Sequence, residues 1–316
     1  MTEPAYQGVI LAAGQGARMG PFGEEVPKPV VPICNKPLLA YQLEHMRRFG
    51  IEEVIVVIGH LGHVITRTLG DGDAYGVRLR YVEQDQRLGI AHAVGQVEPF
   101  IGRPFLLILG DIFFEVPGLR AMADIMEQKD ATAVVAVKEE EDPAAVKRNF
   151  SVSLNEDGTV RRVIEKPRHV PNLLKGCGIY LFDLPIFDAI RRTPRTAMRD
   201  EYELTDSIQI LIDYEYPVHA GSVVEWDMNI TYVGDLIDCC RHQLRRLGIT
   251  RLTGPGCQIA EGTELSETVV GGGAVIAKPA RLERCVVLPG VTVDDGLNYS
   301  DTVFTSRGRL TAGHNL

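Results

Sequence analysis

Gly8-Val-Ile-Leu-Ala-Ala-Gly-Gln-Gly-Ala-Arg-Met-Gly20 is the stretch that decides the fold. Its apolar first half is typical of a buried strand, and its glycine-rich second half does not favour a helix. Gly14, Gly16 and Gly20 let the backbone come close to a phosphate, whose oxygens bare N–H groups can then bind. Arg18 lies inside this loop, where a guanidinium can bind phosphate oxygens bidentately. The stretch therefore predicts a phosphate-binding loop after a buried strand.

Several kinds of loop have this composition. A dinucleotide-binding fold needs a third glycine where Met19 stands, and the apolar run 54–58 ends in Gly59-His60 without an acidic residue for a ribose. An ATP P-loop needs a Gly-Lys-Ser/Thr sequence, which does not follow. A nucleoside triphosphate loop of another kind and a plain glycine turn remain. Lys28 favours the former, because the two prolines that flank it fix the backbone of a cation suited to a phosphate.

Strands and helices are expected to alternate after this loop. This pattern predicts a Rossmann-like α/β domain, in which ligands bind outside the carboxyl ends of the strands. Gly14 and Asp111 both occupy such ends. The expected strands lie at 8–13, 54–58, 105–109 and 134–137, and the expected helices lie at 37–49 and near 61–69 and 117–128.

The later part of the chain has a different pattern. Residues 151–164 indicate a hairpin around a glycine turn, which makes the sheet mixed, and Asp206 indicates the N-cap of a helix that ends near 213. From about residue 250, single apolar residues recur at spacings of five or six between glycines and prolines. This period fits a left-handed parallel β-helix, and an irregular antiparallel cap is the alternative. We expect two domains, residues 1–248 and 249–316.

The charge balance restricts the partners. The 316 residues include 33 Lys and Arg against 42 Asp and Glu, a net charge of −9, and nucleic-acid binding needs a basic surface. The apolar stretch 8–13 is too short for a signal peptide or a membrane span. Six cysteines without a Cys-x-x-Cys pair fit a reducing compartment. We expect a cytoplasmic protein with neither nucleic-acid nor membrane partners.

Further short motifs follow the glycine loop in order. They are Pro27-Lys-Pro29, Asn35-Lys-Pro-Leu38, Tyr81-Val-Glu-Gln84, Leu88-Gly-Ile-Ala-His-Ala93, Leu109-Gly-Asp111, Glu165-Lys-Pro167, Gly178-Ile-Tyr180, Glu203-Leu-Thr-Asp206 and Asp227. The series resembles the sugar-1-phosphate nucleotidyltransferases, which include glucose-1-phosphate thymidylyltransferases and UTP–glucose-1-phosphate uridylyltransferases. The resemblance covers roughly residues 7–245.

The resemblance implies a reaction. The phosphate oxygen of a sugar 1-phosphate attacks the α-phosphorus of a nucleoside triphosphate, and pyrophosphate leaves. Such chemistry depends on charge neutralisation and alignment. Asp111 and Asp227 would hold Mg²⁺, which prefers carboxylate and phosphate oxygens. Arg18 would stabilise the triphosphate and the leaving pyrophosphate, and Lys28 and Lys166 would hold the sugar phosphate and the reacting centre.

The resemblance also implies the binding residues. Glucose 1-phosphate with dTTP or UTP is the favoured substrate pair. The sugar phosphate would be bound by Glu165, which accepts hydroxyl groups, and by Lys166, Gly178 and Tyr180. Gln84 and the backbone of Gly89 would read the base edge, and the rest of the nucleotide would contact Leu11, Ala13, Gly14 and Gly16.

Two departures from the family pattern affect these expectations. Ser151 stands where relatives often have glycine, and Asp-Met-Asn at 227–229 replaces the common Asp-x-Gly-Thr. One alternative is a catalytically inactive regulatory homologue that binds an NDP-sugar. The retained residues argue against it: Arg18, Lys28, Asp111 and Asp227. Another alternative is a nucleotidyltransferase with a different base or a non-sugar phosphate acceptor. The β-helix tail is expected to mediate a homo-oligomer, either a dimer or a tetramer.

Overall fold

The computed structural model describes residues 5–14, 16, 19, 23–24, 26–197 and 199–312. The chain divides into two compact units. The first, here called the sheet unit, comprises residues up to 14 together with 42–227, and the second, the β-helix unit, comprises residues 15–41 together with 228–316. The expected domain boundary after residue 248 stays a prediction. Within the described part of the chain, no helix is long and apolar enough to cross a membrane.

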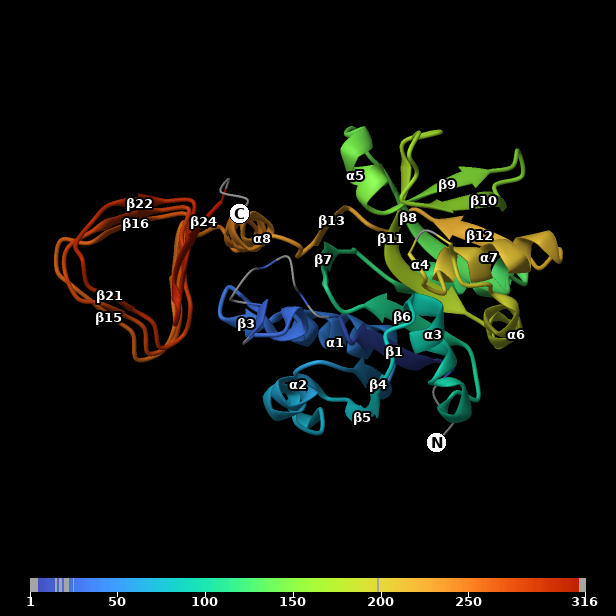
Figure 1. Cartoon of the computed structure of the whole chain (residues 1–316), viewed down its shortest axis with the longest axis horizontal. Helices are drawn as coiled ribbons and strands as arrows, with labels where there is room; N and C mark the ends of the chain where they lie inside the picture. The colour runs from blue at the N-terminus through green and yellow to red at the C-terminus, as the bar shows by residue number, and fades with distance from the viewer. Residues whose placement is uncertain are drawn as a thin grey trace. The chain divides into compact units, whose positions relative to one another are not determined.

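A mixed sheet forms the centre of the sheet unit (Figure 1). β1 pairs in parallel with β4 and β6, and β4 with β5, whereas β11 is antiparallel to β6, β8 and β9. The strand order is β10 (Val160–Glu165), β9 (Phe150–Leu154), β11 (Leu174–Phe182), β6 (Phe105–Leu109), β1 (Gln7–Ala12), β4 (Glu53–Ile58) and β5 (Arg78–Glu83), with β8 (Ala133–Glu139) beside β11 and β12 (Val218–Gly221) beside β8. The expected α/β class and mixed sheet are confirmed.

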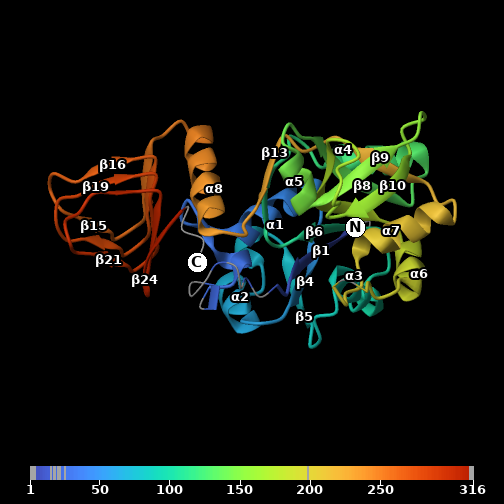
Figure 2. The same ribbon diagram turned by 45° about the horizontal axis from the view of Figure 1, so that its top comes forward.

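The strands follow from sequence runs that are apolar on both faces. Val9 and Ile10, neighbours in β1 that point to opposite faces of the sheet, are both fully buried, as expected for a strand covered on each side. One face packs on α3 (Ile90–Gly95), α6 (Pro185–Arg192) and α7 (Leu204–Asp213), which Figure 2 shows grouped together. The remaining helices are α1 (Leu38–Phe49), α2 (Gly62–Leu69), α4 (Arg120–Lys129), α5 (Pro143–Arg148) and α8 (Val233–Arg246).

The predicted N-cap at Asp206 is wrong. The helix α7 begins at Leu204, and Glu203, with φ −82° and ψ 134°, takes the N-cap position. Asp206 lies in the first turn instead. An acidic residue is favourable there because of the positive end of the helix dipole, so the first turn and the N-cap select the same residue types.

The β-helix unit contains three stacks of short strands, which pair in parallel except that β24 is antiparallel to β23 (Figure 1). The register pairs residues 17 positions apart, as in Val269 with Val286 and Val286 with Val303. One coil thus has three sides, and the expected β-helix is confirmed, while its left-handed sense stays a prediction. The stacks are β14 (Arg251–Thr253), β17 (Thr268–Val270), β20 (Val286–Val287), β23 (Thr302–Thr305) and β24 (Gly308–Thr311); β15 (Gln258–Ile259), β18 (Val275–Ile276) and β21 (Thr292–Val293); and β16 (Glu264–Ser266), β19 (Arg281–Glu283) and β22 (Tyr299–Ser300).

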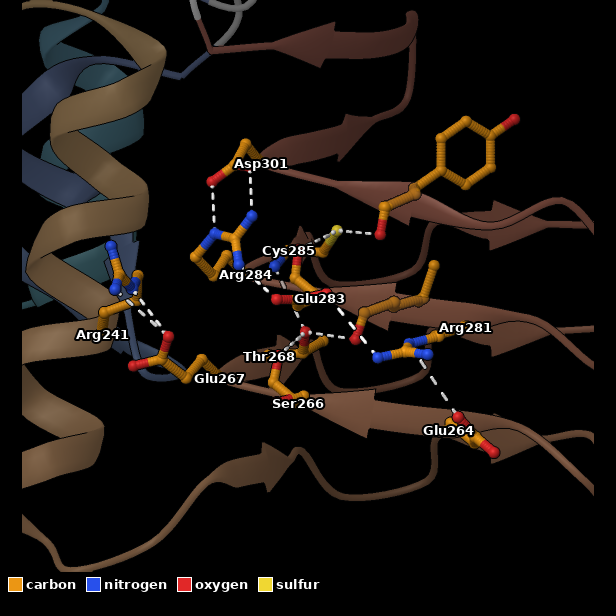
Figure 3. A network of polar contacts seen from close by, with 12 residues as sticks. Arg241, Glu264, Ser266, Glu267, Thr268, Arg281, Glu283, Arg284, Cys285 and Asp301 are labelled. Carbon is orange, nitrogen blue, oxygen red and sulfur yellow. Dashed lines mark hydrogen bonds and ion pairs between the residues drawn. The ribbon is translucent and has the colours of Figure 1, made fainter.

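Equivalent corners of successive coils carry charged residues with left-handed backbone conformation. Glu267, Arg284 and Asp301 have φ of 44°, 52° and 49°, a region that non-glycine residues enter rarely. Arg284 donates to both carboxylate oxygens of Asp301 at 2.7 Å, and Arg241 of α8 pairs with Glu267 (Figure 3). We call Glu267, Arg284 and Asp301, together with Arg241, the corner ladder. It ties one coil to the next and the first of them to α8.

α8 covers one stack of the coils. It packs on β17, β23 and β24 and on β2 (Pro32–Ile33), which pairs with β3 (Lys36–Pro37) (Figure 2). The turn between β2 and β3 is fixed by two bonds within this unit: Asn35 Nδ2 donates to the Val270 carbonyl at 3.1 Å, and Cys34 Sγ to the Cys240 carbonyl at 3.4 Å. Residues 32–37, which follow the glycine loop in the sequence, therefore pack within the β-helix unit.

Candidate active site

Asp111 lies directly after β6, at the carboxyl end of a central strand. The Gly110 N–H donates to the Leu11 carbonyl at 2.8 Å, and a Cβ at Gly110 would come within 2.7 Å of that oxygen. Glycine is required there because β1 and β6 approach closely. Gln42 of α1 is fully buried and donates to the carbonyls of Leu109 and Ile112 at 3.0 and 2.8 Å. The backbone on both sides of the half-buried Asp111 is thus fixed by Gln42, which sequence reasoning missed.

The start of the glycine loop follows β1. Ala13 is buried against Gly59, while Gly14 is exposed, and no atom of the residues that the structure describes lies within 4 Å of where its Cβ would be. Leu11 is half-buried in β1. Gly14 therefore presents bare backbone at the strand end, as a phosphate-binding role requires. Arg18, the expected triphosphate contact, lies outside the described residues.

Lys28 lies in the β-helix unit and begins a 3-10 helix (Lys28–Val30). Its predicted backbone rigidity is present, since Pro27 has φ −65° and ψ 138° and Pro29 follows within the helix. The side chain is only 7% exposed, and its Cγ lies 3.4 Å from where a Cβ of Gly16 would be. Gly16, with φ 67°, thus leaves room for the lysine stem.

The stretch expected to read the base, residues 88–93, is held by the backbone of Tyr202, which directly precedes Glu203. Gly89 has φ 110°, and a Cβ there would come within 2.4 Å of the Tyr202 carbonyl oxygen. The Tyr202 N–H donates to Leu88 O at 2.6 Å, and its carbonyl accepts from Ala91 N–H at 3.0 Å. Only glycine fits between these bonds. Gln84 is buried, with its Nε2 at 3.2 Å from His92 Nδ1. Gln84 and Gly89 thus belong to one structured segment.

Glu165 and Lys166 end β10. Lys166 has φ 41°, and its N–H donates to the Asn149 carbonyl at 2.7 Å, which turns the chain sharply after Glu165. The Glu165 carboxylate lies 3.2 Å from Lys166 Nζ and 3.5 Å from the Arg199 guanidinium. Burial raises the pKa of Glu165, and repulsion from Glu203 raises it further. Lys166 and Arg199 lower this pKa, but the net shift is upward. Glu165 is a partly buried acceptor, whereas Lys166 is exposed.

Gly178 and Tyr180, the other residues predicted to bind the sugar phosphate, lie on β11. A Cβ at Gly178, where φ is 68°, would come within 2.3 Å of Ile112 Cδ1, so β11 passes close to the residue after Asp111. Tyr180 is buried, and its ring stacks on those of Phe150 and Phe182 at 6.0 and 5.4 Å. Burial raises the pKa of its phenol well above the usual value. The ring of Tyr180 is thus packed between two aromatic rings, and its role in binding the sugar phosphate stays a prediction.

Asp227 is the centre of a buried network of charges. Both of its carboxylate oxygens accept hydrogen bonds from Lys175 Nζ at 2.8 Å. Lys175 Nζ also lies 2.6 Å from Glu140, and Lys138 lies 3.1 Å from Glu140 and 3.9 Å from Asp227. Lys175 was missed by sequence reasoning, although a single lysine inside the apolar run 174–182 is the signal that marks it.

The family resemblance assigns Mg²⁺ to Asp111 and Asp227, and the two carboxylates differ in fit. In the described part of the chain, no three His, Cys, Asp or Glu side chains gather as a metal site. Mg²⁺ can be held by one or two carboxylates together with substrate phosphates. Asp111, half-buried at a strand end, fits such a role. The oxygens of Asp227 already accept from Lys175, so this carboxylate does not fit it in the arrangement seen.

Comparison with known proteins shows the family of the chain. Residues 7–227 match the family model described as nucleotidyl transferase. The chain is 36% identical over 223 residues to the low-salt glycan biosynthesis nucleotidyltransferase Agl11 of Haloferax volcanii, covering 70% of this chain but only 61% of that protein. It is 31% identical over 306 residues to a glucose-1-phosphate thymidylyltransferase of Streptomyces antibioticus, covering 95% of this chain and 82% of that one.

A solved structure shows the same fold. It is a putative glucose-1-phosphate thymidylyltransferase from Bacillus anthracis in complex with a sucrose. The two chains are 26% identical with a TM-score of 0.67, and the match covers 75% of this chain and 94% of that one.

Proposed function

The chain belongs to the nucleotidyl transferase family, which includes sugar-1-phosphate nucleotidyltransferases, and we propose that it joins the nucleotidyl group of dTTP or UTP to glucose 1-phosphate. The observation that carries the sugar phosphate as acceptor is the pair at the end of β10. Glu165 is a partly buried carboxylate held between two cations, and Lys166 beside it is exposed. An acceptor for hydroxyl groups next to an available positive charge matches the two ends of a sugar phosphate.

The reacting groups are aligned by this chain's own residues. The bare backbone at Gly14 binds triphosphate oxygens, the rigid Lys28 binds the phosphate of the acceptor, and Arg18 stabilises the pyrophosphate that leaves. Gln84 and the backbone at Gly89 bind the base edge. Lys166 holds the phosphate of the acceptor in line with the α-phosphorus. Asp111 would hold Mg²⁺, which supplies charge neutralisation on the phosphates when it is bound.

The substrate assignment is tested by pyrophosphate release. The purified chain is incubated with Mg²⁺, each of the four common nucleoside triphosphates and a set of sugar 1-phosphates. We expect the fastest release with glucose 1-phosphate and dTTP or UTP, and a loss of about 10²-fold or more in Asp111→Asn. No release with any pair, together with tight binding of an NDP-sugar, would identify the chain as a regulatory homologue instead.

We also propose that the β-helix unit mediates a homo-oligomer. Its stacked strands form flat faces, and flat repeat surfaces pack well on one another. Light scattering on the full chain should give the mass of a dimer or tetramer of the 34.8 kDa chain. A monomer at the concentrations used for activity would remove this proposal.

A further inference from the structure

The network around Asp227 is electrically complete without a metal ion. It contains two carboxylates, Asp227 and Glu140, and two ammonium groups, Lys175 and Lys138, so its formal charges cancel. The side chains of Asp227 and Lys175 are only 1% and 4% exposed. An ion pair at this depth is screened little by solvent, so each partner depends strongly on the other.

Lys175 is also held rigidly. Its backbone lies inside the sheet, where it is in register with Lys138 of β8 on one side and with Ser151 of β9 on the other. Its ammonium group has three donors, and the distances to the two Asp227 oxygens and to Glu140 account for all three. The nitrogen atom is therefore fixed against Asp227 by the fold and by its full set of partners.

We infer that Lys175 takes the place of a metal ion at Asp227, so that the divalent ion of the proposed reaction depends on Asp111 and not on Asp227. A divalent ion bound to Asp227 would compete with the two 2.8 Å contacts from Lys175 and would leave excess positive charge in a buried site. Lys175 is then a positioning residue. It fixes the carboxylate and with it β13 (Trp226–Asn229), which pairs with β7 (Ile112–Glu115), the strand that begins immediately after Asp111.

This inference rests on the proposed function only in assuming that a divalent ion is used. It accords with the sequence departure at 227–229, where the common Asp-x-Gly-Thr pattern is absent. It also gives the single lysine of β11 a reason to be tolerated among apolar neighbours, since a buried ammonium group is costly unless it is paired.

Binding of Mn²⁺, followed by the electron paramagnetic resonance signal of the free ion, tests the inference on the full chain without nucleotide. Lys175→Met leaves Asp227 and Glu140 with Lys138 alone, and we expect it to bind Mn²⁺ at least about tenfold more tightly than wild type, the scale on which neighbouring groups change metal affinity. The gain should vanish in Lys175→Met/Asp227→Asn. Lys147→Met, which removes an exposed lysine of α5, is the matched control and should bind as wild type does.

Two results would overturn the inference. One is the absence of any gain in a folded Lys175→Met. The other is a wild-type affinity for Mn²⁺ that falls in Asp227→Asn. If Lys175→Met does not fold, Lys175→Gln removes the charge while keeping a hydrogen-bond donor and carries the same prediction. A gain in Mn²⁺ binding by a chain that releases no pyrophosphate would sink the proposed function and leave this inference standing, whereas turnover combined with Mn²⁺ loss in Asp227→Asn would do the reverse.

Discussion

The network around Asp227 and the corner ladder of the β-helix both pair carboxylates with cations, lysines in the network and arginines in the ladder, but they differ in burial. The side chains of Lys175 and Asp227 are almost completely buried, whereas those of Arg284 and Asp301 are 28% and 38% exposed. Water and salt compensate the loss of a partner at the exposed site but not at the buried one. Loss of a partner should therefore lower the unfolding free energy greatly in the network around Asp227 and little in the corner ladder.

Breaking the buried network should have the largest effect. Asp227→Ala leaves the ammonium group of Lys175 with Glu140 as its close partner, and loss of one member of a buried pair costs about 3–5 kcal/mol of unfolding free energy. Urea unfolding of the full chain measures this cost. A loss below about 1 kcal/mol would mean that the pair of Asp227 and Lys175 contributes no more than an exposed ion pair does, and would contradict the distinction between the two networks.

The contrast between buried and open positions extends to glycines. Gly89→Ala forces a Cβ within 2.4 Å of a backbone oxygen at a φ of 110°, and we expect it to cost about 1–3 kcal/mol of stability and to weaken nucleotide binding. Gly118→Ala is the matched control, because no atom lies within 4 Å of its Cβ position. Thermal unfolding and a nucleotide titration distinguish them. Equal behaviour of the two variants would contradict the assigned role of Gly89.

The burial of Glu165 lies between that of the Asp227 network and that of the corner ladder. Its contribution to the unfolding free energy depends on pH with a definite sign. Burial raises its pKa, so the folded chain keeps the proton at pH values where the unfolded chain has released it. The stability that the protonated group contributes is complete below the ordinary glutamate pKa of about 4.3 and is lost as the pH rises through the raised pKa. Glu165→Gln stays neutral throughout. Its unfolding free energy relative to wild type should therefore rise as the pH increases above about 4.

The result is checked by urea unfolding of both chains at each pH. A difference that stays constant, or that falls as the pH rises, would show that Lys166 and Arg199 outweigh burial at this carboxyl.

The corner ladder should give the smallest effect. Arg284→Ala removes a bidentate pair with Asp301, but at this exposure the loss should be below about 1 kcal/mol. The loss should also shrink as salt is added, since exposed charges are screened. Unfolding at low and high salt measures both effects. A loss as large as that of Asp227→Ala would mean that the ladder sets the register of the coils.

The elements that were predicted correctly depend on local patterns. The apolar runs at 54–58 and 105–109 became β4 and β6, and the spacing of single apolar residues after 250 gave the β-helix. The coil repeat of 17 was missed although the sequence carries a signal for it, because Gly256, Gly273 and Gly290 lie 17 positions apart and have φ of 70°, 67° and 72°. A second corner, at Glu267, Arg284 and Asp301, takes the left-handed conformation without glycine, and its residue types carry no periodic signal.

A residue of the candidate site could be predicted where it lies within one short sequence motif. Glu165 is the last residue of β10, and Asp111 follows the end of β6 with Gly110 between them. The partners of Asp227 could not be found this way, because Lys175, Glu140 and Lys138 come from β11, from the residue after β8 and from β8 itself. Their meeting depends on the antiparallel register of two strands that lie far apart in the sequence.

Transfer of a labelled nucleotidyl group tests the central claim most directly. The full chain is incubated with Mg²⁺, glucose 1-phosphate and dTTP or UTP labelled with ³²P at the α-phosphorus, and the products are separated. The account predicts that the label enters an NDP-sugar in proportion to the pyrophosphate released. Label that stays in the triphosphate, or that appears in a free mono- or diphosphate, would contradict it.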